Sequence, residues 1–273
     1  MSENKYTLED LGYLMTRLRD PETGCPWDLK QTAASIVPFT LEEVYELIET
    51  IESQDHDAEC DELGDVLFQI VFYAQLAQES GRYDLSDVVD RIVRKLLRRH
   101  PHVFPDGTLS SKSDECVDIP EVKARWEQIK QVERQQKNQH HPLDDIPLAL
   151  PALPRAHKVQ KRAVTLGLDW PSIDGVLAKV KEELAELEVA IQAGLPSREE
   201  ELGDLIFSCV NLARHLNVDS EQSLREATRK FERRARAYAD LAAQEKVDLN
   251  AASEEVKDQL WGRVKSGFAG KSS

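Results

Sequence analysis

The sequence predicts an all-α protein built from two tandem helical-bundle modules that are related by an internal duplication. Strand signals are nearly absent from the 273 residues, whereas apolar residues recur at helical spacing throughout. The tetrapeptide Glu-Leu-Gly-Asp occurs twice, at 62–65 and at 201–204. Each copy follows a Glu-Glu-x-x-Glu cluster, which begins at Glu42 in the first half and at Glu182 in the second. The repeated acidic pattern indicates that both halves contain the same helical unit.

The repeat extends beyond the acidic motifs. Lys95-Leu-Leu-Arg-Arg matches Lys230-Phe-Glu-Arg-Arg, and Trp126 matches Trp261. The offset between the halves is 140 residues at the first acidic cluster, 139 at the tetrapeptide and 135 at both later matches. One register with two short deletions explains all of these matches. So small a number of copies argues against a solenoid.

A change in composition divides the chain. We predict an N-terminal module over 1–130, a proline-rich linker over 131–154, a C-terminal module over 155–267 and a flexible tail over 268–273. Four prolines between positions 142 and 154 disfavour continuous helix there, because proline removes a backbone donor and restricts the residue before it.

Apolar stripes predict the helices of each module. One helical face carries Leu41, Val44, Ile48 and Ile51 in the first half, and Val180, Leu184, Leu187 and Ile191 in the second. The segments 66–76 and 205–216 are so strongly apolar that we expect buried helices there. Gly81 and Asn217 stand where these helices are expected to end.

Composition and charge exclude several classes of protein. The formal net charge of −15 argues against binding to nucleic-acid backbones, which favour a basic surface. The longest apolar stretch, 66–77, is too short to span a bilayer, and the polar, acidic N-terminus is unlike a secretory signal. The four cysteines lack C-x-x-C spacing, as expected of free thiols in a reducing compartment. We therefore expect a cytoplasmic protein that contacts neither membrane nor nucleic acid.

The acidic motifs predict a metal site. Glu183 and Glu186 lie three residues apart on one helix, and Glu201 and Asp204 have the same spacing on the next. If these helices pack antiparallel, the four carboxylates converge, and a hard cation such as Mg²⁺ relieves their repulsion. Glu182, one residue off this face, could hold or activate a water molecule.

Two other metal sites and a plain solvated helix face are alternatives. A di-iron carboxylate bundle pairs its glutamates with a Glu-x-x-His motif, which neither acidic segment contains. His100-Pro-His102 could suggest zinc, but no further ligands lie nearby in the sequence.

A basic cluster in the second half suits phosphate groups. Lys230 and Arg234 are four residues apart on one helical face, so both could contact a polyphosphate. Trp261 could stack on a base, and core packing is its alternative role. The alternative for the basic pair is an ordinary solvated face. No P-loop precedes a helix, so phosphate binding must come from metals and side chains.

Taken together, these motifs resemble the all-α nucleoside triphosphate pyrophosphohydrolases, and the two-module arrangement is similar to the MazG family. The supporting stretches are Leu18-Arg-Asp-Pro-Glu-Thr-Gly-Cys-Pro-Trp-Asp28, Arg98-Arg-His-Pro-His-Val-Phe104 and Arg155-Ala-His-Lys-Val-Gln-Lys-Arg-Ala163. The resemblance covers nearly the whole chain. It implies a homodimer and Mg²⁺-dependent hydrolysis of nucleoside triphosphates to the monophosphate and pyrophosphate.

The resemblance also implies roles for individual residues. The metal ligands of the family correspond to Glu183, Glu186, Glu201 and Asp204, and its nucleotide contacts correspond to Lys179, Glu182, Lys230, Arg234 and Trp261. The first half keeps Glu43, Glu46, Glu62 and Asp65, a candidate second metal site, but Phe39 stands in register with Lys179. We therefore expect the second half to be the better catalyst, with Glu182 as the residue that orients the attacking water.

The sequence thus predicts a hydrolase that attacks the α-phosphorus of many nucleoside triphosphates and serves to clear nucleotide pools. One alternative is a narrow-specificity dUTP or modified-nucleotide hydrolase. The other is a non-catalytic helical protein that senses nucleotides.

Overall fold

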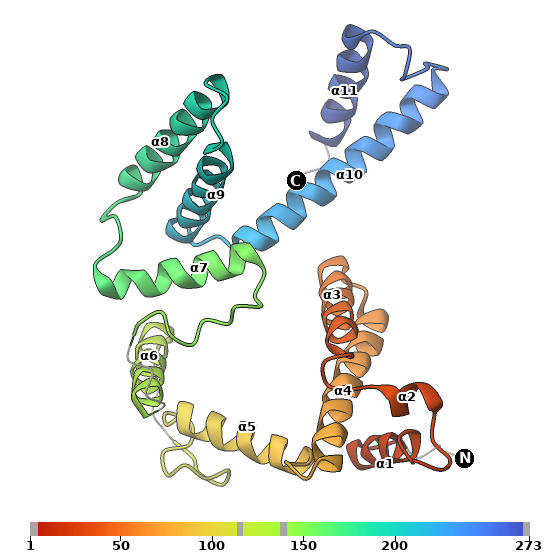
Figure 1. The fold of residues 1–273 in the computed structure, drawn as a ribbon, viewed down its shortest axis with the longest axis vertical. Helices are drawn as coiled ribbons and strands as arrows, with labels where there is room; N and C mark the ends of the chain where they lie inside the picture. The colour runs from red at the N-terminus through yellow and green to blue at the C-terminus, as the bar shows by residue number, and fades with distance from the viewer. Residues whose placement is uncertain (1–4, 114–116, 137–140, 270–273) are drawn as a thin grey trace. The chain divides into compact units, whose positions relative to one another are not determined.

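The computed structural model describes residues 5–113, 117–136 and 141–269, and it confirms the predicted fold class. Within these ranges the regular structure is helical and contains no strand (Figure 1). The chain divides into two compact units, 1–130 and 131–273.

The first unit is organised around a helical hairpin. Its helices are α1 (Leu8–Leu18), α2 (Pro26–Lys30), α3 (Val37–Ser53), α4 (His56–Glu79) and α5 (Leu85–Arg99), and α6 (Ile119–Gln136) begins in this unit. The turn between α3 and α4 is tight because Gln54 adopts a left-handed conformation (φ +60°) and the side chain of Asp55 caps α4 by accepting from the Ala58 amide. Helix α1 packs on α4.

The core of the first unit lies where α1, α4 and the start of α3 meet. Met15, Ile36, Val71 and Phe72 are buried there. Arg19 closes one side of this core, since its guanidinium lies 5.4 Å from the Phe72 ring centre and donates to Glu79 at 2.6 and 2.7 Å. The two hydrogen bonds join the end of α1 to the end of α4.

The second unit repeats the hairpin with a different surround. Its helices are α7 (Ala152–Ala163), the short 3₁₀ helix η1 (Val164–Leu166), α8 (Ile173–Gln192), α9 (Arg198–His215), α10 (Ser220–Gln244) and α11 (Glu254–Ala269). Helices α8 and α9 form the hairpin, α7 packs on α9, and α11 packs on α10 (Figure 1). Asp169 joins the loop before α8 to the end of α9 by accepting from Arg214 at 2.5 Å and contacting His215 at 2.9 Å.

Both predicted helix ends are confirmed. Gly81 (φ +66°) and Asn217 (φ +55°) each follow a helix by two residues and adopt the left-handed conformation. The amide after each reaches back into the last turn, from Arg82 to the Ala77 carbonyl and from Val218 to the Ala213 carbonyl. These bonds satisfy carbonyl groups that the helix leaves without partners.

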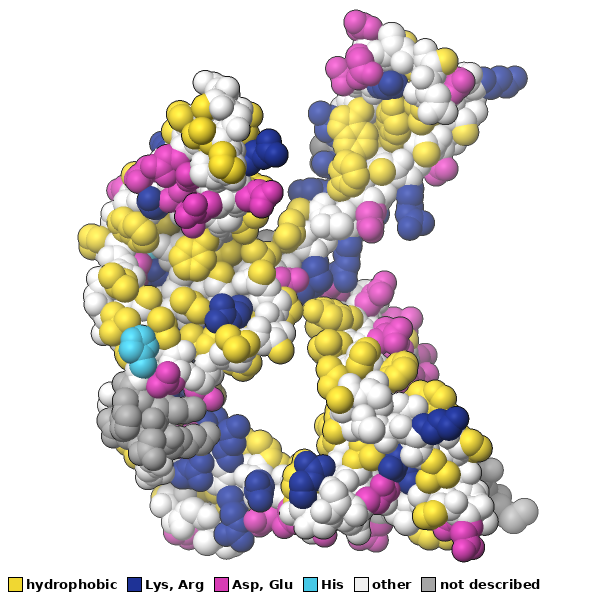
Figure 2. All heavy atoms as spheres, viewed as in Figure 1, with side chains coloured by type: hydrophobic (Ala, Val, Ile, Leu, Met, Phe, Trp, Pro, Cys, Tyr) yellow, Lys and Arg dark blue, Asp and Glu magenta, His cyan; other side chains and the backbone are white. Residues whose placement is uncertain are grey.

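The expectation that 66–76 and 205–216 form wholly buried helices was wrong. Val71 and Val210 are buried, but Ile70 and Ile206 are 45% and 46% exposed. Each hairpin helix packs a single face within its unit, so its opposite apolar face meets solvent. The predicted stripes are affected in the same way, since Leu41, Ile51, Leu184 and Ile191 are between 46% and 61% exposed. Figure 2 shows such apolar side chains gathered on the α8–α9 hairpin.

The linker boundaries stay a prediction. Helix α6 continues to Gln136, into the first residues of the predicted linker, and α7 begins at Ala152, just before its end. The described residues between them, 141–151, contain no helix. In the predicted tail, 268 and 269 belong to α11 and 270–273 lie outside the described residues, so the flexibility of the tail stays a prediction. None of the helices in the described ranges combines the length and apolar character that crossing a bilayer requires.

Candidate metal and nucleotide site

The α8–α9 hairpin brings three predicted metal ligands together. Glu183 on α8 and Glu201 and Asp204 on α9 each offer a carboxylate oxygen, and these oxygens lie within 4.8 Å of one another. Glu183 is buried at 4% exposure, Glu201 is half-buried and Asp204 is exposed, so the cluster opens toward solvent on one side. Figure 2 shows the acidic side chains gathered over this hairpin.

Crowding of negative charge affects the titration of this cluster. Burial raises the pKa of Glu201, and the neighbouring carboxylates of Glu186, Glu200, Glu183 and Asp204 raise it further. Glu186 therefore acts on the cluster electrostatically, although its oxygens lie outside the group of three. A divalent cation would remove this repulsion.

Lys179 supplies the positive charge beside the cluster. Its Nζ lies 2.8 Å from Glu182 Oε1 and 2.6 Å from Glu183 Oε1, because residues three and four apart share a helix face. The hydrogen bonds to Glu182 and Glu183 raise the pKa of Lys179 well above its usual value. Glu182 is therefore held on the rim of the cluster by the lysine, and it is not one of the three converging carboxylates.

The remaining predicted nucleotide contacts lie on α10 and α11. Lys230 is exposed, and Arg234 is half-buried with its Nε buried and unpaired. The Trp261 ring packs 5.8 Å from Phe231 and 5.9 Å from Tyr238, which is the core-packing alternative noted for it. Among residues 141–269, no recorded hydrogen bond, ion pair or ring contact joins Lys230, Arg234 or Trp261 to the carboxylates of the α8–α9 hairpin.

The α3–α4 hairpin repeats the carboxylate cluster. Glu43, Glu62 and Asp65 have oxygens within 4.8 Å of one another, while Glu46 lies outside the group. Burial first, and then neighbouring carboxylates, raise the pKa of both Glu43 and Glu62. In place of Lys179 stands Phe39, which meets the ring of Trp27 edge-on at 5.6 Å. This cluster thus has no cation at the corresponding position.

The donors of both clusters suit a hard divalent cation. All six converging side chains are carboxylates, the ligands that such ions prefer. Glu62 Oε2 is buried and makes no hydrogen bond, which leaves a negative oxygen without compensation. Burial and neighbouring carboxylates raise the pKa values of Glu43, Glu62 and Glu201, which indicates the same lack of compensating positive charge. Neither of the two carboxylate clusters found among the described residues includes His100 or His102. The zinc alternative therefore gains no support.

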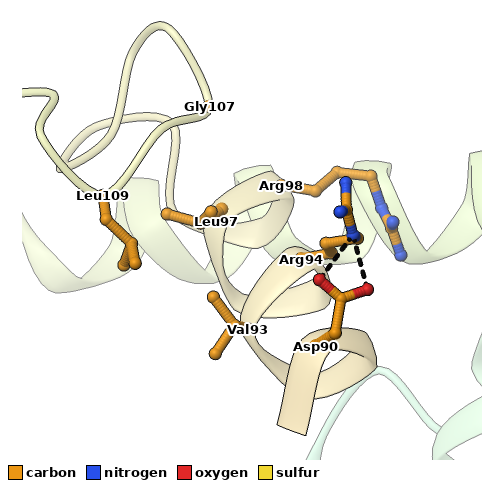
Figure 3. A pocket seen from close by; sticks show the side chains of 7 residues that line it. All are labelled: Asp90, Val93, Arg94, Leu97, Arg98, Gly107 and Leu109. Atoms are coloured by element: carbon orange, nitrogen blue, oxygen red, sulfur yellow. Dashed lines mark hydrogen bonds and ion pairs between the residues drawn. The ribbon is translucent and has the colours of Figure 1, made fainter. Parts of the chain in front are cut away.

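The basic cluster of the first unit lies on α5. Figure 3 shows a pocket of about 540 Å³ beside this helix, lined by Val93, Leu97 and Leu109. The single N–H of Arg94 Nε donates a bifurcated hydrogen bond to the two oxygens of Asp90, at 2.7 and 2.9 Å, so this arginine is already paired. Arg98, the first-half counterpart of Arg233, extends beside it.

Sequence reasoning missed a second pocket, which adjoins the α8–α9 cluster. It has a volume of about 540 Å³, and its lining includes Gln160, Trp170, Asn211 and Lys179. The sequence identifies the segment from Arg155 to Ala163 only by its resemblance to the family, and it predicts no pocket there. No spacing rule connects Gln160 to α9, because the two meet through the packing of α7 on α9.

The fold and these clusters define a duplicated all-α protein with a carboxylate cluster in each hairpin that could hold a metal ion. A family model for the MazG nucleotide pyrophosphohydrolase domain matches the chain twice, at residues 31–104 and 172–238. These two matches contain the α3–α4 and α8–α9 hairpins.

Full-length relatives agree with the family model. The chain is 49% identical to a nucleoside triphosphate pyrophosphohydrolase of Escherichia coli strain K12, over 92% of this chain and 94% of the relative. It is 42% identical to the nucleoside triphosphate pyrophosphohydrolase/pyrophosphatase MazG of Thermotoga maritima, over 98% and 99%. The chain therefore belongs to the MazG nucleotide pyrophosphohydrolase family and is an enzyme of that family.

Proposed function

We propose that this protein hydrolyses nucleoside triphosphates, both ribo- and deoxyribo-, to the monophosphate and pyrophosphate, with Mg²⁺ as cofactor and broad base preference. The observation that carries the proposal is the second-module cluster of Glu183, Glu201 and Asp204 with Lys179 beside it. Membership of the MazG family supports the reaction type.

The carboxylates are assigned to the metal. Glu183, Glu201 and Asp204 would hold it directly, and Glu186, whose charge reaches Glu201, completes the proposed ligand set. When bound, the cation supplies charge neutralisation and polarisation of the phosphoryl group. Glu43, Glu62, Asp65 and Glu46 are the corresponding set in the first module.

The other side chains bind the triphosphate and orient water. Lys179 has a flexible four-carbon stem, so its ammonium group can turn from the carboxylates toward a phosphate oxygen. That movement frees the Glu182 carboxylate to accept a hydrogen bond from the water that attacks the α-phosphorus. Lys230, Arg234 and Trp261 stay as proposed nucleotide contacts on the strength of the family resemblance.

We also propose that the protein is a homodimer. The support is the apolar face that each hairpin leaves in solvent, where Leu184, Ile191, Leu202 and Ile206 are between 46% and 61% exposed. A dimer would bury this face, and it offers a way for Lys230, Arg234 and Trp261 of one chain to approach the carboxylates of another. Light scattering at micromolar concentration tests the state, and a monomer would contradict it. The exposed thiols of Cys60 and Cys209 fit the predicted cytoplasmic location.

Product analysis tests the proposed reaction. Each nucleoside triphosphate is incubated with the protein and Mg²⁺, and the products are identified by mass. We expect monophosphate and pyrophosphate from several bases, and no turnover when the metal is chelated. Diphosphate with orthophosphate would mean attack at the terminal phosphorus and would contradict the mechanism. Turnover of dUTP alone would favour the narrow-specificity alternative, and binding without turnover would favour the sensing alternative.

A further inference from the structure

A pocket of about 540 Å³ lies beside the second-module cluster, bounded by α7, the loop before α8, α8 and α9. Its walls are mainly apolar, with contributions from Val159, Leu168, Trp170, Val176 and Phe207. Binding pockets for small organic ligands have this character, with apolar walls and a few fixed polar groups. An aromatic ring system could lie against the Trp170 and Phe207 side chains.

Gln160 lines this pocket and carries a buried hydrogen-bond acceptor that has no partner. Its side chain is 6% exposed, and its Nε2 donates to the Phe207 carbonyl oxygen at 2.8 Å. A carbonyl oxygen only accepts, so this bond fixes which end of the amide is nitrogen. The other end, Oε1, is buried and has no hydrogen-bond partner. A buried acceptor without a donor costs on the order of 1–3 kcal/mol, which a ligand N–H group would recover.

Asn211 provides a donor in the same pocket. It is also 6% exposed, and its Oδ1 accepts from Arg214 Nε at 2.9 Å. That bond leaves the Asn211 amide nitrogen as the donating end of the side chain. The pocket thus offers both an acceptor and a donor, and the edge of every nucleobase carries the complementary pair.

Lys179 connects the pocket to the carboxylates. It lines the pocket, and its Nζ lies 2.6 Å from the cluster residue Glu183. A ligand with its aromatic ring in the pocket and its phosphates at the carboxylate cluster would therefore extend past Lys179.

The first module differs from the second at the position of Asn211. Phe72 stands in register with Asn211, at the offset of 139 residues, and it is 1% exposed within a core that includes Met15. The position that holds a buried amide in one module therefore holds a buried aromatic ring in the other. A structural need of the hairpin fold does not explain Asn211, because the same fold accepts phenylalanine.

We propose that the pocket behind Lys179 holds the nucleobase of the triphosphate, with Gln160 Oε1 accepting a hydrogen bond from a base N–H group. This inference rests on the proposed function for the identity of the ligand. It adds a base-binding residue and assigns the pocket, and it accounts for broad base preference because every nucleobase has such an N–H group.

The test compares ligands with and without a base. Affinities of a nonhydrolysable nucleoside triphosphate and of inorganic tripolyphosphate are measured by calorimetry in the presence of Mg²⁺, using the full-length chain. Gln160→Met keeps the side-chain length but removes the acceptor, and Ala163→Leu fills the pocket without removing a hydrogen bond. The matched control is Gln192→Met, a glutamine exposed on α8 outside the pocket. Thermal unfolding shows whether each variant is folded.

We expect both pocket variants to weaken nucleotide binding about tenfold and to leave tripolyphosphate binding unchanged, while Gln192→Met changes neither. Unchanged nucleotide binding in the two folded pocket variants would overturn the proposal. An equal loss for both ligands would overturn it too, because the pocket would then serve the phosphates. Turnover is measured separately, so an inactive wild-type protein that still showed the base-dependent loss would contradict the proposed reaction alone.

Discussion

The two hairpins share their acidic cluster and differ in what surrounds it. Both α3–α4 and α8–α9 bring three carboxylates within 4.8 Å of one another. At the position one turn before the buried glutamate, the second hairpin has Lys179 and the first has Phe39. The interior next to the cluster is a pocket lined by Asn211 in one module and a core filled by Phe72 in the other. A candidate cation site therefore recurs wherever this hairpin is repeated, whereas the proposed phosphate-facing charge and room for a base require separate residues.

The two modules also reverse the charges of their internal anchor. In the first, Arg19 from α1 donates to Glu79 on α4, and in the second, Asp169 from the loop before α8 accepts from Arg214 on α9. Each anchor ties the hairpin to the segment that precedes it. The two ion pairs are not in register, since Glu79 corresponds to Val218 and Arg214 to Gln75, so each module has an ion pair of its own at this junction.

The largest expected effect separates the two clusters by activity. Glu183→Gln should lower kcat for nucleoside triphosphates on the order of 10³-fold, because it removes a charged ligand of the catalytic cation. Its counterpart Glu43→Gln should change kcat by less than about threefold, since Phe39 and Phe72 stand in the first module where the second has Lys179 and Asn211. Pyrophosphate release measures both. A greater loss from Glu43→Gln would reverse the assignment of the catalytic module.

A smaller effect is expected from the lysine. Lys179→Met should lower kcat/KM about tenfold, because it removes one charged contact to phosphate but leaves the carboxylates in place. The converse change, Phe39→Lys, puts an ammonium group one turn before Glu43. It should not create measurable turnover in the first module of a Glu183→Gln protein, since Phe72 still fills the adjoining interior. Turnover from that double variant would mean that the lysine is the sole difference that matters.

The smallest effect concerns the anchors and depends on pH. Hydrogen bonds from Arg19 lower the pKa of Glu79 against the opposing effect of burial. Between its lowered folded pKa and its ordinary value of 4.5, the unfolded chain binds more protons, so this stabilisation is present above pH 4.5 and is lost as the pH falls through the folded pKa. Arg19→Met should therefore destabilise the protein by about 1 kcal/mol at pH 7, a modest value because Glu79 is partly exposed.

Urea unfolding at pH 7 and near pH 3 measures this anchor. The difference between wild type and Arg19→Met should shrink as the pH falls through the lowered folded pKa of Glu79, because this carboxyl group is then protonated in both proteins. Burial opposes the lowered pKa of Asp169, but the bonds from His215 and Arg214 outweigh it, so Asp169→Asn should show the same trend from pH 3.8 downward. A difference that stays constant with pH would show that packing of Arg19 against Phe72, rather than its charge, stabilises the module.

Short-range spacing made much of the site predictable. Glu201 and Asp204 share a helix face because they are three residues apart, and the duplication indicated that this face is used twice. The glycine at 81 and the asparagine at 217 ended helices as expected, since both tolerate the left-handed conformation. In each hairpin the packing of the two helices brings only the first glutamate of the Glu-x-x-Glu pair into the cluster. Glu46 and Glu186 therefore lie outside it.

The rest depended on packing between distant segments. Gln160 reaches Phe207 across 47 positions of sequence, and no periodicity predicts that contact. The apolar faces were expected to be buried because hydrophobic periodicity identifies a packing face without identifying what covers it. Trp261 shows the same limit, since its indole could equally have stacked on a base, and here it packs on Phe231 and Tyr238.

The double ion pair of Lys179 has a consequence for a cell short of magnesium. The ammonium group of Lys179, held between two carboxylates, supplies part of the positive charge that a dication would bring. The second hairpin can therefore stay assembled without a bound cation. The first hairpin has no such ammonium group, and its carboxylates must instead take up protons or tolerate their mutual repulsion. Metal scarcity should therefore destabilise the α3–α4 hairpin first, before the half of the chain in which we propose that turnover takes place.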